Sequence, residues 1–384
     1  MKGYTAFIIY VLITLFFGAS VRDFFGIQQE NEGLLGIVHW YSLPFILIAV
    51  IANRSSIKFG KSEKMVLLFS VLSVVLSKLL GRSAGLAVII NISLEPVLLL
   101  VYLKTLDEIQ LSKLKKIVLF AFFFECSCAL FEAITTNVLF ARSSDIIDYA
   151  GDIRANALYG HPLQNAFIVG MTSILIIFSN GNYIKRYSLF LFGLLAIFCF
   201  NTRSSIYLLA GILVIAVVRD LLYLRKSFSV KCLMIFCLLI SVYLFLNFIE
   251  SHSLGTRLDT GLTEDDSSSN ARFLLLGYFD RLDLLDILFG VSTQYTEDFM
   301  FKNNLIAIEN SFLGLINCSG LFFTIPYTIF MGKSLYLKEY SKWSATLIFL
   351  SLFLLLNANN ALITNAPLIP IFAMSSFVLY KVKS

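Results

Sequence analysis

The chain has 384 residues, of which 58% are hydrophobic and only 14% are charged, and its formal net charge is +5. A soluble domain carries about 25% charged residues, so this composition excludes an ordinary soluble protein. Apolar runs recur along the whole length, each long enough to cross a hydrocarbon core about 30 Å thick. We therefore predict an all-α polytopic membrane protein.

In chain order, the apolar runs predict about twelve transmembrane helices. They lie near residues 4–20, 34–52, 65–80, 86–103, 117–139, 162–179, 188–201, 204–218, 232–249, 312–331, 345–360 and 366–380. Only GRSAG separates the third from the fourth, and only a turn around Asn201 and Arg203 separates the seventh from the eighth. We expect one multi-pass domain, 1–384, in which a large outer loop, 250–311, joins the ninth and tenth helices.

The distribution of charge predicts the side that each loop faces. Cytoplasmic loops retain Lys and Arg. With the N-terminus inside, 20 of the 30 basic residues fall in the even-numbered loops and the two tails, whereas acidic residues number five inside and 17 outside. We therefore expect both termini in the cytoplasm. The first run follows only Lys2 and lacks a cleavage site, so we expect a retained helix.

The basic residues predicted to lie outside are mostly Arg. Eight of the nine are Arg, namely Arg22, Arg82, Arg142, Arg154, Arg203, Arg257, Arg272 and Arg281. A guanidinium presents a planar fork that suits phosphate or carboxylate. These side chains either bind an anion or pair with the outer acids. Arg203, between two apolar runs, either reaches to water at the membrane surface or points into an outer cavity that holds an anion.

Three outer segments are long or unusual in composition: 141–167, 200–207 and 250–311. In the last, ARFLLLGYFDRLDLLDILFG has apolar residues at helical spacing, which predicts an amphipathic helix on the outer membrane face or over the mouth of the bundle.

Three acidic residues, Glu95, Glu125 and Glu132, lie within predicted spans. Carboxylates in a membrane indicate functional candidates. Glu125 and Glu132 are seven residues apart and therefore share a helical face. They either act in the function or hydrogen-bond polar neighbours such as Ser127 or Thr135.

Several kinds of site are not indicated by the sequence. It has three His residues and no HExxH, GxSxG or P-loop motif, and its six cysteines all fall in apolar runs. A zinc hydrolase, a serine esterase and an ATP motor are therefore not predicted. We expect no metal, no cofactor and no nucleic acid partner.

Four segments in order carry a resemblance: RANALYGHPLQNAF, FNTRSSIYLLAGILV, NARFLLLGYFDRLDLLDILFGVS and ENSFLGLINCSGLFF. Together they resemble the O-antigen polymerase and ligase superfamily of bacterial envelope proteins, over about residues 150 to 325. The chain departs from that pattern where Glu309 replaces a His common in ligases, where Thr-Arg-Ser-Ser replaces Ser-Arg-Gly, and where Gln164 replaces an Asn.

The resemblance implies a glycosyltransferase of GT-C-like architecture in the bacterial inner membrane, with its active site on the periplasmic face. Such enzymes transfer a sugar chain from undecaprenyl diphosphate, without metal and with inversion, to an acceptor hydroxyl. Glu309 in place of His favours a Wzy-type polysaccharide polymerase over a ligase that acts on lipid A core. A lipid-linked oligosaccharide flippase or another secondary transporter is the alternative from a different class. A Wzz-type chain-length regulator and membrane lipids are the other expected partners.

From these segments we assign hypothetical roles. Arg203, Arg272 and Arg154 bind the diphosphate, Glu309 is the general base for the acceptor hydroxyl, and Asn310 orients Glu309 or the sugar. Alternatively, Asn310 or Ser311 is a helix N-cap. Further sugar contacts are expected from His161, Asn270 and Arg281, although His161 has the alternative of a structural hydrogen bond before Pro162.

Overall fold

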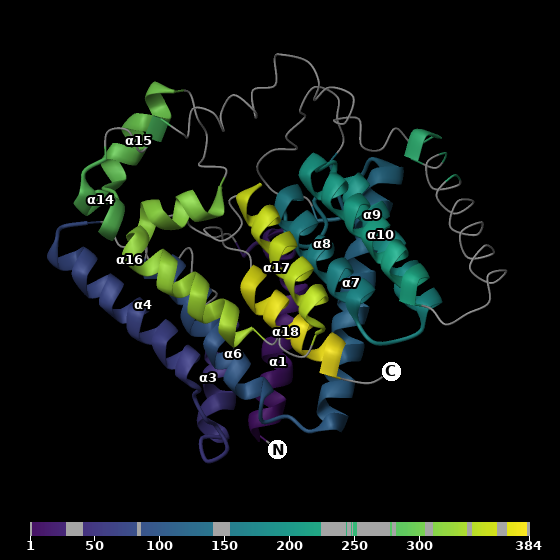
Figure 1. The fold of residues 1–384 in the computed structure, drawn as a ribbon, viewed down its shortest axis with the longest axis horizontal. Helices are drawn as coiled ribbons and strands as arrows, with labels where there is room; N and C mark the ends of the chain where they lie inside the picture. The colour runs from purple at the N-terminus through teal and green to yellow at the C-terminus, as the bar shows by residue number, and fades with distance from the viewer. Residues whose placement is uncertain are drawn as a thin grey trace.

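The computed structural model describes residues 2–27, 41–82, 86–140, 154–223, 282–303, 310–335, 340–358 and 367–381, together with residues 243, 247, 249–251 and 277–278. In these ranges the regular structure is helical (Figure 1). The helices are α1 Lys2–Phe16, α2 Ala19–Phe24, α3 Leu43–Ala52, α4 Lys61–Leu79, α5 Leu86–Ile89, the π-helix η1 Ile90–Leu94, α6 Glu95–Leu103, α7 Glu108–Thr135, α8 Pro162–Phe178, α9 Tyr183–Phe200, α10 Arg203–Tyr223, α14 Leu284–Phe289, α15 Thr293–Lys302, α16 Ser311–Ser334, α17 Lys342–Asn357 and α18 Leu368–Lys381.

Four of these helices, α7, α9, α10 and α16, have the length and apolar composition needed to cross a membrane. The longest, α7, has 28 residues, or about 42 Å at 1.5 Å per residue. Six more apolar helices are shorter. The chain is therefore a helical membrane protein. The predicted ninth helix, 232–249, lies almost wholly outside the described residues.

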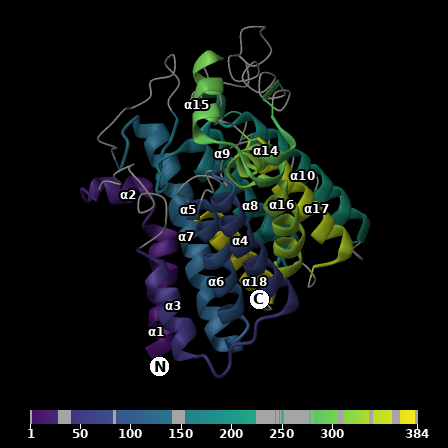
Figure 2. The same ribbon diagram turned by 90° about the vertical axis from the view of Figure 1, so that its left-hand side faces the viewer.

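Both termini lie at one end of the bundle, which we name the terminal end (Figure 1). The opposite end, the loop end, carries the 154–161 segment, the turn between α9 and α10, α14, α15 and the start of α16. The short helix α2 runs crosswise to α1 at the loop end (Figure 2). At both predicted breaks one helix ends and another begins: α4 ends before and α5 begins after 81–85, and α9 ends before and α10 begins after 201–202.

The helix α8 is the centre of the packing. Fifteen of its 17 residues are buried, and it packs on α7, α9, α10, α17 and α18. The outer helices instead leave apolar side chains exposed, such as Val71 on α4, Phe120 on α7 and Val214 on α10. Exposed apolar side chains on helices around a buried centre are the arrangement that a bilayer requires, because lipid covers the outer faces.

The helix α16 is broken at Gly320, which has φ 70° and ψ 172°. The break leaves carbonyl groups without helical partners, and neighbouring segments supply donors. The Val291 N–H donates to the Asn317 carbonyl at 2.8 Å, and the Ser73 hydroxyl donates to the Ser319 carbonyl at 3.4 Å. Backbone irregularity inside a membrane protein is tolerated only where such partners are present.

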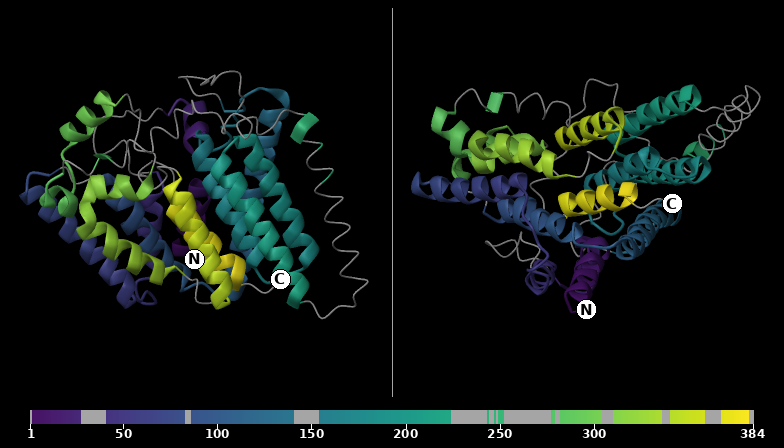
Figure 3. Two further views of the ribbon diagram at one scale, coloured as in Figure 1. Left: turned by 45° about the horizontal axis from the view of Figure 1, so that its top comes forward. Right: turned by 60° about the horizontal axis from the view of Figure 1, so that its bottom comes forward.

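The break positions α14 against α16 and α4. A Cβ added to Gly320 would overlap the carbonyl group of Leu288, so only glycine allows this close approach. The Arg82 guanidinium pairs with Asp286, and the Ser77 hydroxyl donates to the Phe289 carbonyl at 2.9 Å. Views from two further directions show α14 and α15 beside α16, with α17 between this group and α8 to α10 (Figure 3).

The amphipathic helix predicted over 271–290 lies only partly within the described residues, since 271–276 and 279–281 fall outside them. Residues 282 and 283 are not helical, and Asp283 is the N-cap of α14, which begins at Leu284. The prediction of an unbroken helix is therefore wrong at these two residues. Leu284 and Leu285 are exposed. Asp283 favours a helix start at this point because its carboxylate accepts a hydrogen bond from a backbone N–H of the first turn of α14.

Candidate functional site

The segment 154–161 at the loop end contains two of the predicted site residues, Arg154 and His161. Four consecutive backbone N–H groups of this segment donate to buried side chains. Those of Asn156 and Ala157 donate to Oε2 of Glu132 at 2.7 and 2.9 Å. The Leu158 N–H donates to Oε2 of Glu125 at 3.2 Å, and the Tyr159 N–H donates to Oδ1 of Asn165 at 3.1 Å.

The two intramembrane carboxylates therefore bind loop backbone. Glu132 also accepts from the Leu139 N–H at 2.9 Å through its second oxygen. The hydroxyls of Ser127 and Thr135, which were possible partners, instead donate to carbonyls of their own helix. The alternative that these carboxylates hydrogen-bond polar groups is therefore confirmed, but the two suggested partners are wrong. Each hydroxyl instead reaches the carbonyl four residues earlier.

Arg154 lies against the end of α9. Its Nε donates to the Phe200 carbonyl at 3.3 Å, and the N–H of the next residue, Ala155, donates to the Cys199 carbonyl at 3.1 Å. The chain then turns at Asn201, which has φ 54°, and α10 begins at Arg203. Arg154 and Arg203 are both half-buried. Two of the three predicted diphosphate ligands therefore belong to adjoining segments of the loop end.

His161 is the N-cap of α8, with its Nδ1 accepting from the Leu163 N–H at 3.2 Å. The expected structural hydrogen bond before Pro162 is present. Asn165, one turn further, donates to the Asn156 carbonyl and so ties α8 back to the same segment.

Asn310 is the N-cap of α16. Its Oδ1 accepts from the N–H groups of Phe312 and Leu313, both at 3.0 Å, and its Nδ2 donates to Oδ1 of Asn357 at 3.2 Å. The capping alternative for Asn310 is therefore confirmed. Asn357, at the end of α17, was not singled out from the sequence, because nothing in the run NANN at the end of this apolar segment marks one Asn above the others.

Glu309, Arg272, Asn270 and Arg281 lie outside the described residues, so their predicted roles stay predictions.

The segment that follows Arg281 docks on α16 through the turn at Gly290, which has φ 96°. Tyr278 donates to Asn317 and lies 3.1 Å from the Thr296 hydroxyl. Burial raises the pKa of Tyr278 to about 12. The Arg82–Asp286 pair shows that one of the arginines predicted to lie outside pairs with an acid predicted to lie on the same side.

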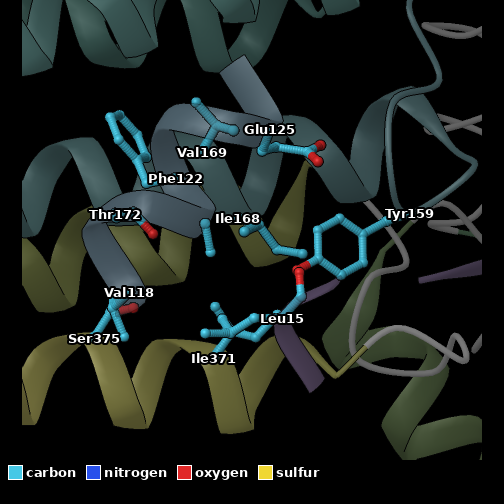
Figure 4. Close-up of a pocket in the computed structure, with 11 residues that line it drawn as sticks. Leu15, Val118, Phe122, Glu125, Tyr159, Ile168, Val169, Thr172, Ile371 and Ser375 are labelled. Atoms are coloured by element: carbon cyan, nitrogen blue, oxygen red, sulfur yellow. The ribbon is translucent and has the colours of Figure 1, made fainter. Parts of the chain in front are cut away.

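A small cavity of about 20 Å³ lies beneath the 154–161 segment. Figure 4 shows Glu125 and Tyr159 toward one side of it, with Thr172 and Ser375 toward the other. One Glu125 oxygen, Oε1, and the Ser375 hydroxyl are buried without a hydrogen-bond partner. The cavity has room for about one water molecule. Burial and the nearby Glu125 raise the pKa of Tyr159, whose hydroxyl donates to the Leu15 carbonyl at 2.9 Å.

Within the described ranges, no group of three or more His, Cys, Asp or Glu side chains is arranged to hold a metal ion. The predicted site residues and their partners at the described part of the loop end are Arg154, Arg203, His161, Asn310 and Asn357. These groups donate hydrogen bonds or carry positive charge, and they can bind an oxyanion and sugar hydroxyls.

No family model matches the chain, and neither the curated proteins nor the solved structures contain a match.

Proposed function

We propose that this protein is a polysaccharide polymerase of the bacterial inner membrane, which joins oligosaccharide repeat units carried on undecaprenyl diphosphate. The observation that supports the proposal best is the contact of Arg154 with the end of α9, directly before the turn that leads to Arg203. Two arginines on adjoining segments suit a diphosphate, because its negative charge grows as the sugar leaves.

In the proposed reaction, an acceptor hydroxyl oxygen attacks the anomeric carbon of the donor sugar. The bond from that carbon to the diphosphate oxygen breaks, and undecaprenyl diphosphate leaves with the bonding electrons. The hydroxyl proton passes to the Glu309 carboxylate. Arg154, Arg203 and Arg272 stabilise the departing diphosphate, while Asn310 holds the start of α16 beside Glu309.

The remaining roles are part of the same proposal. His161, Asn270 and Arg281 contact the sugars, and no metal or cofactor takes part. The loop end faces the periplasm and the terminal end, with both termini, faces the cytoplasm. Membrane lipids and a Wzz-type chain-length regulator are the proposed partners. A GT-C-like arrangement of about twelve spans is part of this proposal.

The test is to replace Arg154, Arg203 and Glu309 singly with Ala in the native host and to separate the polysaccharide on a gel. We expect the polymer ladder to be lost while single repeat units persist, at normal protein abundance. Lipid-linked polymer without surface attachment would identify a ligase instead. An unchanged ladder in the Glu309→Ala variant would reject Glu309 as the base.

A second candidate, transport of a lipid-linked oligosaccharide, is favoured by a separate observation. Transporters place interrupted helices and buried charges near the middle of the membrane. Here a π-helix, Ile90–Leu94, precedes the buried Glu95, which accepts from the Ser42 hydroxyl at 3.0 Å, and α16 is broken at Gly320. Loss of repeat units from the periplasmic side in an Arg203→Ala strain would favour transport over polymerisation.

A further inference from the structure

The conformation of segment 154–161 depends on side chains from the core of the bundle. Glu125, Glu132 and Asn165 are each at most 2% exposed, and together they accept the four N–H groups from Asn156 to Tyr159. Side chains inside a bundle are held by packing, so they fix the backbone that binds to them. Side chains of α7 and α8 therefore fix the position of segment 154–161.

The same segment contains backbone conformations that need such support. Ala157 has φ 39° and Gly160 has φ 74°. A residue other than glycine rarely adopts a positive φ. The Ala157 N–H donates to Glu132 at this position. An unfavourable φ persists only where the surrounding structure supports it, and this hydrogen bond provides such support.

Glu132 and Glu125 make unequal contributions. Glu132 uses both oxygens and accepts three N–H groups, from Leu139, Asn156 and Ala157. Glu125 accepts one N–H, from Leu158, and its other oxygen has no partner. An amide in place of Glu132 would face a backbone N–H with its own NH2 group, whereas an amide in place of Glu125 can keep its single bond and turn its NH2 group toward the cavity.

We propose that Glu132 is a positioning residue, which places the Arg154 guanidinium for the diphosphate through the backbone of residues 156–157. The inference rests on the proposed function. Arg154 is two residues before the first of these N–H groups, and its Nε is held on the other side by the Phe200 carbonyl. Glu132 thus lies outside the site and acts on it only through the segment that it binds.

The experiment compares Glu132→Gln with Glu125→Gln, two identical changes on one face of α7. The full-length protein is purified in nanodiscs, and undecaprenyl diphosphate is the binding probe. We expect Glu132→Gln to weaken its binding about tenfold, the effect of leaving about one buried N–H group unpaired. We expect Glu125→Gln to stay within about twofold of the unchanged protein. Glu132→Asp, which retains both oxygens, should recover part of the affinity.

Thermal unfolding of every variant separates positioning from general stability. If Glu132→Gln and Glu125→Gln bind the diphosphate equally well, or if affinity follows melting temperature across the set, the inference is wrong. Arg154→Gln tests the underlying function separately. If it leaves diphosphate binding unchanged, the proposed function fails. If it weakens binding while Glu132→Gln does not, only the positioning inference fails.

Discussion

Substitution of Gly320 by Ala tests whether the broken helix α16 is required by the fold. Gly320 has φ 70° and ψ 172°, a region of backbone space that is essentially confined to glycine. Its Cα lies so close to the turn after α14 that an added Cβ would overlap the Leu288 carbonyl group. The alanine variant must therefore straighten α16, move α14 away, or do both.

The loss of stability expected for Gly320→Ala has two contributions. Holding a residue with a Cβ in this region costs about 1 to 3 kcal/mol. Moving α14 also breaks the 2.8 Å bond from the Val291 N–H to the Asn317 carbonyl, and a buried polar group left unpaired costs about 1 to 3 kcal/mol. We therefore expect a loss of about 2 to 6 kcal/mol in the stability of this part of the protein.

The assay is thermal unfolding in nanodiscs, combined with limited proteolysis of the outer loop. The matched control is Gly211→Ala on α10, where an added Cβ meets nothing within 4 Å. That change should stabilise the helix by about 0.5 to 1 kcal/mol. Gly320→Ala should lower the melting temperature and speed cleavage near α14 and α15. Equal melting temperatures and equal cleavage rates for the two variants would refute the reasoning.

Three further predictions concern other parts of the structure. Asp220→Asn should destabilise the terminal end by about 3 to 5 kcal/mol, because Arg186 is buried and pairs with Asp220 at 3.1 Å; unchanged thermal unfolding would contradict this. The free energy of unfolding should fall as the pH rises from 10 to 12. The pKa of Tyr278 is near 10.0 in the unfolded chain and about 12 in the folded protein. Over this range the folded state therefore keeps a proton that the unfolded state has lost. Tyr278→Phe should remove that part of the pH dependence, and tyrosinate absorbance measures the ionisation directly. Asn310→Ala should cost about 1 kcal/mol through the lost N-cap, whereas Asn310→Asp should retain most of the stability; a lost polymer ladder in the Asp variant at normal abundance would indicate a role beyond capping.

Some features of the candidate site could be predicted from the sequence, and others could not. The spacing of Glu125 and Glu132 placed both carboxylates on one face of a helix, and the structure has both facing segment 154–161. Their ligands were not predictable, because a backbone N–H group has no signature in the sequence. The same holds for Asn357, whose partner Asn310 comes from a different helix.

The amino-acid sequence by itself determined the membrane class and the approximate helix positions. The length of an apolar run and the local break at Asn201 are properties of neighbouring residues, so they need no knowledge of the fold. Only the tertiary structure decided which polar groups meet. Glu132 binds a backbone 24 residues away, Arg154 one that is 46 residues away, and Arg82 pairs with an acid 204 residues away. Such pairs depend on how the helices pack, because it is packing that brings distant segments to the same end of the bundle.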